Sequence, residues 1–462
     1  MKQVWAIAKL AFWEGIRMRI VLVFLFVLIF ALLRLPFAMR GDETLSGRLQ
    51  TFLSYSLGAL SLFMGLATVF LSCATLSNEM KTRSLQMVVT KPVTRFQILL
   101  GKWLGVNGLN LLMVVLGGLT IYSFAVFIKT RGVEGTFDRD ARKLRDTVWT
   151  ARVAAEPTKP DLEPEARKQI EEAEQQGAGF IEGKEVAVAR KRAELLEQWR
   201  AVQPGDYRVY QFDNLTAPET ADTVFQLRFK ARGSPLTQDE SVPILWLVLD
   251  PSTREVRYEL PTTQRTGEEH QFLLGSGIFK DGTAYVGVVS PPPPNRTTIH
   301  FEGEGSLKVL YKVGSFEANY VKALILVLAR LAFLSALGVF FTTFVSFPVG
   351  CFCVLSIYLF CIGVPWWLDS MGANLEAGQG NAKIDPYGVA GPLVRALLVP
   401  LLKTIVPDFV KYDGVGQLIE GEAITSNLLS TALSHTLLYG VFLLLVPGWL
   451  IFRSREVAQV QV

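Results

Sequence analysis

Six long apolar stretches constrain this chain more than any other feature. The hydrocarbon core of a bilayer is about 30 Å thick, and a helix needs roughly 20 apolar residues to cross it. Stretches of about this length or longer occupy residues 20–38, 52–76, 98–128, 320–345, 350–368 and 428–452. The chain is 50% hydrophobic with 30 Phe, which is too apolar for an ordinary soluble protein. The sequence therefore predicts a polytopic α-helical membrane protein with six transmembrane helices.

The leader, residues 1–19, is amphipathic. Trp5, Leu10 and Trp13 can be buried while Lys2 and Lys9 contact lipid phosphates. This pattern predicts an interfacial helix that lies along the membrane surface, although the leader could instead extend the first span.

The distribution of Lys and Arg predicts the orientation. With both termini in the cytoplasm, the inner segments hold eleven Lys and Arg and the short outer segments hold seven. Cytoplasmic loops carry the excess of basic residues. Residues 20–128 then hold the first three spans, and a cytoplasmic loop at 77–97 joins the second span to the third. The large domain that follows lies on the outer side. Residues 319–462 hold the last three spans and an outer loop at 369–426, of which residues 391–410 could enter the membrane.

The polar region between the third and fourth spans divides into two parts. Residues 129–205 are rich in Ala, Glu, Lys and Arg and predict a helical, stalk-like segment with helices over 139–156, 164–176 and 183–202. A loosely ordered charged linker is the alternative. Residues 206–318 contain eight short alternating segments separated by Pro, Gly, Asp or Asn. They predict a β-sandwich, jelly-roll-like, so that the outer domain is α+β.

Three aromatic residues of the predicted sandwich have two interpretations. Trp246, Tyr258 or Tyr285 could bind a sugar or a lipid headgroup, as in a lectin. The favoured interpretation is that they fill the core of the sandwich.

Several classes of function find no support in the sequence. It has no G-x-x-x-x-G-K-[ST] motif, so any ATP that drives this protein is bound by another chain. The four Cys lie in apolar stretches and the three His are scattered, which gives no metal-ligand pattern and no disulfide framework. A net charge of +4 makes no case for nucleic acid. The spans also lack the paired polar groups of an intramembrane enzyme.

The loop between the second and third spans combines basic residues with a proline. A short amphipathic helix is expected to start near Glu79, capped by Ser77 or Asn78, and to end before Pro92. Thr94 then caps a new helix that enters the third span. Such an element can dock into a groove of a soluble partner, or it can be a surface helix held by lipid phosphates.

This loop resembles the conserved cytoplasmic loop of type-2 ABC transporter permeases. The closest match is the branch named for multicopper-enzyme maturation. The matching elements are Glu79, Ser84-Leu85, Lys91-Pro92-Val93-Thr94-Arg95, Leu100-Gly101-Lys102 and Gly105. Many relatives place Gly where this chain has Arg83, so the chain departs from the family pattern at the tight turn where the helix starts. The resemblance covers the membrane half of the chain and excludes residues 130–318.

The resemblance implies a membrane subunit of an exporter, with no enzymatic activity of its own. In that family a six-helix unit dimerises beneath two ATPase subunits, which hold the ATP and Mg, and the loop carries the coupling helix. The residues it assigns to ATPase coupling are Glu79, Arg83, Leu85, Pro92, Arg95 and Lys102. It also implies the inner membrane of a bacterium, with surrounding lipid, a second copy of the chain and an ABC ATPase as partners. The rival hypothesis is a mechanotransmission or binding protein whose outer domain engages a periplasmic partner or ligand without transport.

Arg330 is a candidate intramembrane charge. It lies eight residues after Lys322, about 12 Å deeper on a straight helix. A charge at this depth is costly and is usually paired or near water. Arg330 is expected to contact an anionic substrate group or a structural carboxylate at the bundle or dimer seam, or else to snorkel to the headgroups.

Overall fold

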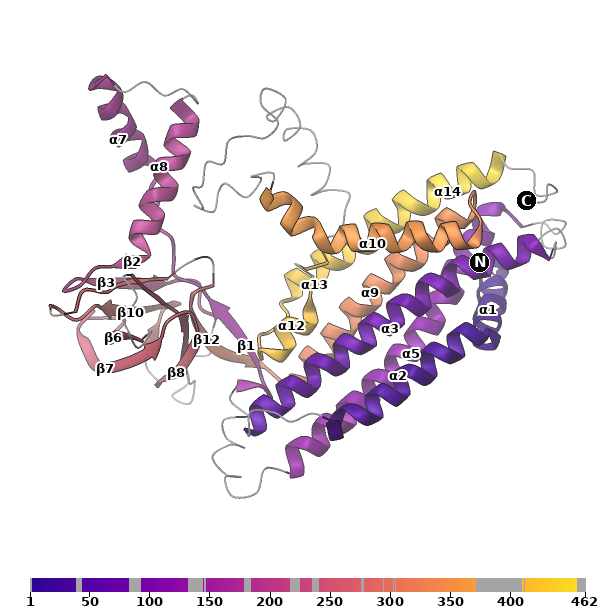
Figure 1. Cartoon of the computed structure of the whole chain (residues 1–462), viewed down its shortest axis with the longest axis horizontal. Coiled ribbons are helices and arrows are strands. Elements are labelled where there is room, and N and C mark those ends of the chain that lie inside the picture. Colours follow the sequence, from indigo (N-terminus) through magenta and orange to yellow (C-terminus); the bar gives the residue numbers. More distant parts are fainter. Residues whose placement is uncertain are drawn as a thin grey trace. The chain divides into compact units, whose positions relative to one another are not determined.

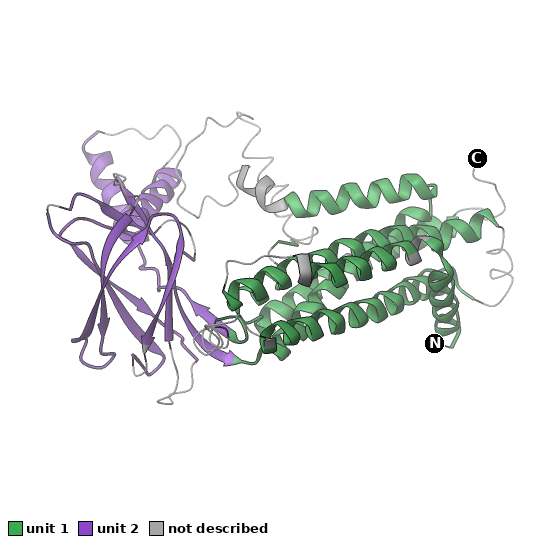
Figure 2. Ribbon diagram, turned by 60° about the horizontal axis from the view of Figure 1, so that its bottom comes forward, with its two compact units in different colours: residues 1–151, 314–367, 396–462 green, residues 152–313, 368–395 purple. Residues whose placement is uncertain are grey.

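The computed structural model divides the chain into two compact units, which are described separately (Figure 2). Unit 1 comprises residues 1–151, 314–367 and 396–462, and unit 2 comprises residues 152–313 and 368–395. The residues that the structure describes are 2–38, 44–82, 93–131, 144, 147–177, 184–216, 225–234, 241–275, 278–293, 295–301, 303, 305–370, 409–410 and 412–454.

Unit 1 is helical (Figure 1). Its helices are α1 (Lys2–Arg17), α2 (Arg19–Ala38), α3 (Leu45–Lys81), α5 (Arg95–Arg131), α9 (Phe316–Thr342), α10 (Phe347–Ser370), α12 (Gly414–Ile419), α13 (Ser426–Leu433), the π-helix η2 (Ser434–Val441) and α14 (Phe442–Ser454). Each predicted span falls on one of these helices or, for the last span, on the run from α13 to α14. At 1.5 Å per residue, the 37 residues of α3 measure about 55 Å, so α3 is longer than the hydrocarbon core it would cross.

Four helices in the described part of the chain are long and apolar enough to cross a membrane. They cover Leu45–Lys81, Arg95–Thr130, Phe316–Thr342 and Ser426–Ser454. Two shorter apolar helices cover Val23–Leu35 and Phe347–Gly363. A membrane protein is therefore supported, whereas six spans and their orientation stay a prediction.

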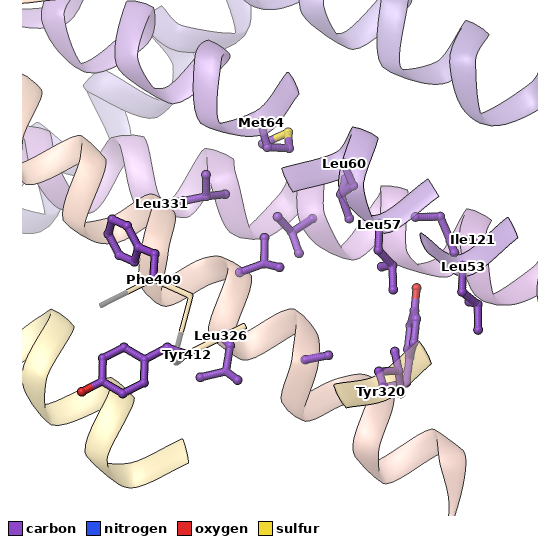
Figure 3. Packing of buried hydrophobic residues seen from close by; sticks show 14 of the residues in the cluster. Leu53, Leu57, Leu60, Met64, Ile121, Tyr320, Leu326, Leu331, Phe409 and Tyr412 are labelled. Atoms are coloured by element: carbon purple, nitrogen blue, oxygen red, sulfur yellow. The ribbon is translucent and has the colours of Figure 1, made fainter. Parts of the chain in front are cut away.

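The core of unit 1 lies where α3 packs on α9. Leu53, Leu57, Leu60 and Met64 recur on one face of α3 and are buried, as the four-residue and three-residue spacing of a helix requires. Figure 3 shows them beside Leu326 and Leu331 of α9 and Ile121 of α5. The long apolar helices therefore bury one face within the bundle.

The leader forms a helix of its own. Helix α1 ends at Arg17, the N–H of Met18 bonds to the carbonyl of Gly15, and α2 begins at Arg19. Figures 1 and 2 both show α1 turned away from the axis of α2. The leader is thus not a straight extension of the first span, and its place at the membrane surface stays a prediction.

Unit 2 contains a β-sandwich of two antiparallel sheets with jelly-roll connectivity. The long strands are β1 (Ala151–Ala155), β3 (Tyr207–Phe212), β4 (Phe225–Lys230), β6 (Ser241–Leu249), β7 (Val256–Arg265), β8 (Glu269–Gly275), β10 (Thr283–Val289) and β12 (Leu307–Gly314). One sheet has the order β1-β12-β4-β8 and the other β3-β10-β6-β7. Two sheets interleaved in this way are the double Greek key of a jelly roll. Short strands β2 (Ala201–Val202), β5 (Arg232–Ser234), β9 (Phe279–Lys280) and β11 (Thr298–His300) complete the unit.

Aromatic side chains fill the core of the sandwich. Trp246 is fully buried, with its ring centroid 4.6 Å from that of Phe229 and 5.5 Å from that of Phe272. Its indole N–H donates to the hydroxyl of Thr262 at 3.0 Å. Tyr285 is also buried, whereas Tyr258 is 40% exposed. For Trp246 the structure agrees with the core interpretation rather than with a lectin-like site. Tyr285 lies outside the core cluster, with its ring centroid 4.9 Å from the guanidinium of Arg254.

One element of the helical segment was predicted wrongly. A helix was expected over residues 139–156, but residues 151–155 form strand β1, an edge of the first sheet. Helices α7 (Glu163–Gln175) and α8 (Lys184–Trp199) do form, as an insertion between β1 and β3. The sandwich therefore begins at residue 151 rather than 206. The Ala-rich sequence of β1 is typical of a helix, and its pairing with β12 overrides that local preference.

Candidate functional site: the base of the α3–α5 loop

Glu79 lies in the last turn of α3. A separate helix was expected to start near Glu79, but α3 continues through it to Lys81. Leu76 and Ser77 are buried, and no Gly or Pro interrupts residues 76–81, so packing and local preference both extend the helix. The expected helix over 79–90 is therefore wrong at its start, and residues 83–92 lie outside the described part of the chain. Arg83, Leu85 and Pro92 belong to those residues and stay predictions.

Thr94 caps α5, as predicted. The N–H of Gln97 donates to the hydroxyl of Thr94 at 3.3 Å, and the N–H of Thr94 donates to the side-chain carbonyl of Gln97 at 3.0 Å. This reciprocal pair is a capping box, which satisfies two backbone donors at the start of a helix. The cap sets where the chain re-enters the bundle.

A buried ion pair joins α3 to α5 at the base of the loop. The ammonium of Lys102 lies 2.8 Å from the carboxylate of Glu79 and donates to the carbonyl of Thr75 at 3.0 Å. The side chain of Lys102 is 2% exposed and that of Glu79 12%. The two charges stabilise each other only while both are present, because a lone buried charge is costly. Two residues that the sequence singled out thus fasten the helices on either side of the loop.

A third charged residue, Glu14 of α1, lies near this pair. Burial raises the pKa of the Glu14 carboxyl, nearby Lys102 opposes this rise, and nearby Glu79 adds to it. Three helices therefore bring one cation and two carboxylates together. No sequence motif pointed to Glu14. Its only signal was that no other acidic residue occurs among the first 41.

Glycines of α5 let α1 approach closely. A Cβ at Gly105 would lie 2.5 Å from the carbonyl oxygen of Ala8 and 2.7 Å from the Cβ of Ala11. A Cβ at Gly101 would lie 2.8 Å from the Cβ of Ile7. Gly101 and Gly105 are four residues apart and so share one face of α5. These contacts give the Gly-Lys-x-x-Gly pattern a physical meaning, because both glycines face α1 while Lys102 faces α3.

Arg95 connects the start of α5 to the end of α14. Its guanidinium donates to the carbonyl of Arg453 at 2.8 Å and also to that of Phe452, and it lies 5.6 Å from the centroid of the Phe452 ring. The last carbonyls of a helix have no partner within the helix, and a cation there is favourable. Arg95 thus contributes to the site by holding the C-terminal helix.

Arg330 binds a residue of the predicted outer loop at 369–426. Its guanidinium donates to the hydroxyl of Ser61 at 3.2 Å and to the carbonyl of Phe409 at 3.1 Å, and it lies over the Phe409 ring at 5.3 Å. Lys322 donates to the carbonyl of Ile424 at 2.8 Å. Polar residues of α9 therefore hold Phe409 and Ile424 against the bundle. Contact of Arg330 with a substrate anion stays a prediction.

Glu14 predicts a pH dependence of stability. Because its pKa is raised in the folded state, that state keeps a proton which the unfolded chain has lost at pH values just above the ordinary value of 4.5. The free energy of unfolding should therefore fall as the pH rises through this window. We expect Glu14→Gln to flatten the fall, as measured by the melting temperature in detergent across pH. Parallel melting curves for wild type and variant would contradict the burial of this carboxyl.

Arg330 should control exchange in the segment it holds. Arg330→Gln removes two hydrogen bonds from a charged donor, and we expect it to cost roughly 1–3 kcal/mol of local stability. Hydrogen exchange of residues 412–424 should speed up accordingly. Arg330→Lys should not restore it, because an ammonium lacks the planar fork. Unchanged exchange in both variants would show that the guanidinium does not hold this segment.

Comparison with known proteins gives one partial similarity. The chain is 36% identical over 140 residues to a protein of Stutzerimonas stutzeri described as probable ABC transporter permease protein NosY. The match covers 29% of this chain, and the chain spans about half, 49%, of that relative. No family model matches the chain, and no solved structure matches it.

Proposed function

We propose that this chain is the membrane-spanning permease subunit of an ATP-driven ABC exporter in the inner membrane of a bacterium. It works as a homodimer, with a separate ATPase docked on the cytoplasmic loop between α3 and α5. The partial similarity to a permease and the four long apolar helices support this proposal. The chain performs no hydrolysis, because the ATP and Mg belong to the ATPase.

The observation that carries the proposal is the buried pair of Glu79 and Lys102, 2.8 Å apart. It fixes the two helix ends from which the docking loop extends. A displacement of residues 82–94 therefore moves α3 and α5 together, because packed interiors transmit strain rather than absorb it. Through Gly105 the same movement reaches α1, and through Arg95 it reaches α14.

The proposal assigns the residues of the loop distinct tasks. Arg83, Leu85 and Pro92 form the surface that contacts the ATPase. Glu79, Lys102 and Arg95 transmit its movement into the bundle. When the ATPase dimer closes, the helical bundle then changes from one arrangement to the other.

The experiment combines cross-linking with ATPase measurements. An ABC ATPase from the same organism is purified together with Arg83→Cys or Leu85→Cys variants of this chain and treated with a short thiol cross-linker. Both variants should cross-link to the ATPase, whereas Tyr207→Cys, an exposed position of the sandwich, should not. Purified ATPase should hydrolyse ATP faster with the permease than alone. Labelling of the Arg83→Cys variant by an impermeant thiol reagent added outside intact cells would refute the orientation.

The rival function gives a different result in the same preparation. If the permease stimulates the ATPase but vesicles that contain the complex transport no substrate, the result favours the rival function. The chain would then be a mechanotransmission protein with a periplasmic partner rather than an exporter. The helical insertion α7–α8 between β1 and β3 is the element to delete in that case.

A further inference from the structure

An apolar groove runs between α5 and α9 on the surface that faces away from the core of unit 1. It has a volume of about 420 Å³. Its walls are aliphatic and include Leu111, Val115, Leu119, Val321, Leu324 and Leu328. Four of these side chains are at least half exposed, which shows that the groove opens away from the core.

The floor of the groove presents no free polar group. A Cβ at Gly118 would lie 2.6 Å from Leu324, so the glycine brings the two helices together there. The hydroxyl of Tyr320 donates to the carbonyl of Gly118 at 2.7 Å and leaves only its ring to line the groove. The part of a ligand that contacts this floor must therefore be a hydrocarbon.

The groove has the length of one leaflet. Its lining extends from Leu111 to Tyr122 on α5 and from Glu317 to Leu328 on α9. Each run advances eleven residues, or about 16 Å of helix. The hydrocarbon of a bilayer is about 30 Å thick, so the groove covers about half of it.

Charged and aromatic groups gather at one end of the groove. Glu317 and Tyr122 belong to the lining, and the indole N–H of Trp149 donates to the carboxylate of Glu317 at 3.1 Å. The ammonium of Lys129 lies 4.0 Å from the centroid of the Trp149 ring. A cation, a carboxylate and an indole thus lie where α5 ends and α9 begins. Trp is the residue typical of the headgroup level.

We propose that this groove binds one phospholipid with a zwitterionic headgroup, from the leaflet at the C-terminal end of α5. One acyl chain fills the groove, the lipid phosphate contacts Lys129, and the lipid ammonium contacts Glu317. The opposite charges of the rim match the opposite charges of the headgroup. The inference requires only that α5 and α9 lie in a membrane. Its test is therefore independent of the test of ATPase coupling.

The test is native mass spectrometry of the full chain in detergent, with added dioleoylphosphatidylethanolamine or dioleoylphosphatidylglycerol. Val115→Trp fills the groove, and Leu116→Trp is its control because Leu116 is equally exposed, at 51%, but lies outside the lining. We expect Val115→Trp to weaken binding of the ethanolamine lipid about tenfold, or about 1.4 kcal/mol, and Leu116→Trp to leave it unchanged. Wild type should prefer the ethanolamine lipid, and Lys129→Gln with Glu317→Gln should abolish that preference.

Three outcomes would overturn the proposal. Equal lipid binding by the two Trp variants would show that lipid does not occupy the groove. Loss of a dimer in Val115→Trp with unchanged lipid binding would assign the groove to a second copy. Equal binding of both lipids by wild type would remove the role of the charged rim.

Discussion

Replacing Lys102 by methionine is expected to lower the free energy of unfolding by about 3–5 kcal/mol, among the largest effects of a single substitution in unit 1. Methionine keeps most of the length of the side chain but removes the charge. Glu79 then stays buried without its partner at 2.8 Å, and Glu14 loses the cation that opposes the rise of its pKa. The cost arises mainly from the carboxylates left behind.

The measurement is equilibrium unfolding of the purified chain in mixed detergent micelles. Lys81→Met is the matched control, because Lys81 is exposed in the same turn of α3 as Glu79. The double variant Lys102→Met with Glu79→Gln should recover part of the loss, because neither member of the pair is then charged. If Lys102→Met is as stable as Lys81→Met, the pair does not fasten α3 to α5.

Replacing Gly105 by alanine is expected to detach α1 from α5. The new Cβ would lie 2.5 Å from the carbonyl oxygen of Ala8, which is backbone and cannot turn away like a side chain. Overpacking of this kind costs about 1–3 kcal/mol, and a larger residue such as leucine should cost more. ATPase coupling should weaken as well, because in the proposed function α1 moves with α5.

Gly108→Ala provides the control on the same helix. A Cβ at Gly108 would meet the ring of Phe12 at 3.6 Å, an ordinary contact. Limited proteolysis reports the state of α1, whose Lys2, Lys9 and Arg17 are sites for trypsin. We expect cleavage within α1 to accelerate in Gly105→Ala and to stay at the wild-type rate in Gly108→Ala. Equal rates in the two variants would show that α1 does not depend on Gly105.

Local patterns predicted those elements whose causes are local. Thr94 was recognised as a cap because a threonine just before a helix can accept a backbone N–H bond within one turn, and in the structure that N–H belongs to Gln97. Strands β4 and β12 were recognised because apolar and polar residues alternate along them. The long helices follow from apolar runs that only a helix can satisfy in lipid.

Elements that depend on distant partners were missed. Strand β1 has the composition of a helix and is a strand because it pairs with β12, more than 150 residues later in the chain. Glu14 had no motif around it, since its significance depends on where α1 packs. Glu79 was expected to begin a helix, because the sequence could not show that burial of Leu76 and Ser77 continues α3 through it.

The sequence by itself determined the class of protein: its apolar stretches require helices in a membrane, and its alternating segments require a sheet. It also singled out Glu79 and Lys102, but only as members of a motif. The tertiary structure decided that these two residues form a buried pair, that Glu14 lies beside them, and that Gly101 and Gly105 admit α1. The physical reason is that hydrophobic periodicity is a property of the local sequence. The desolvation of charged side chains and the close contact of backbones depend instead on which helices pack together.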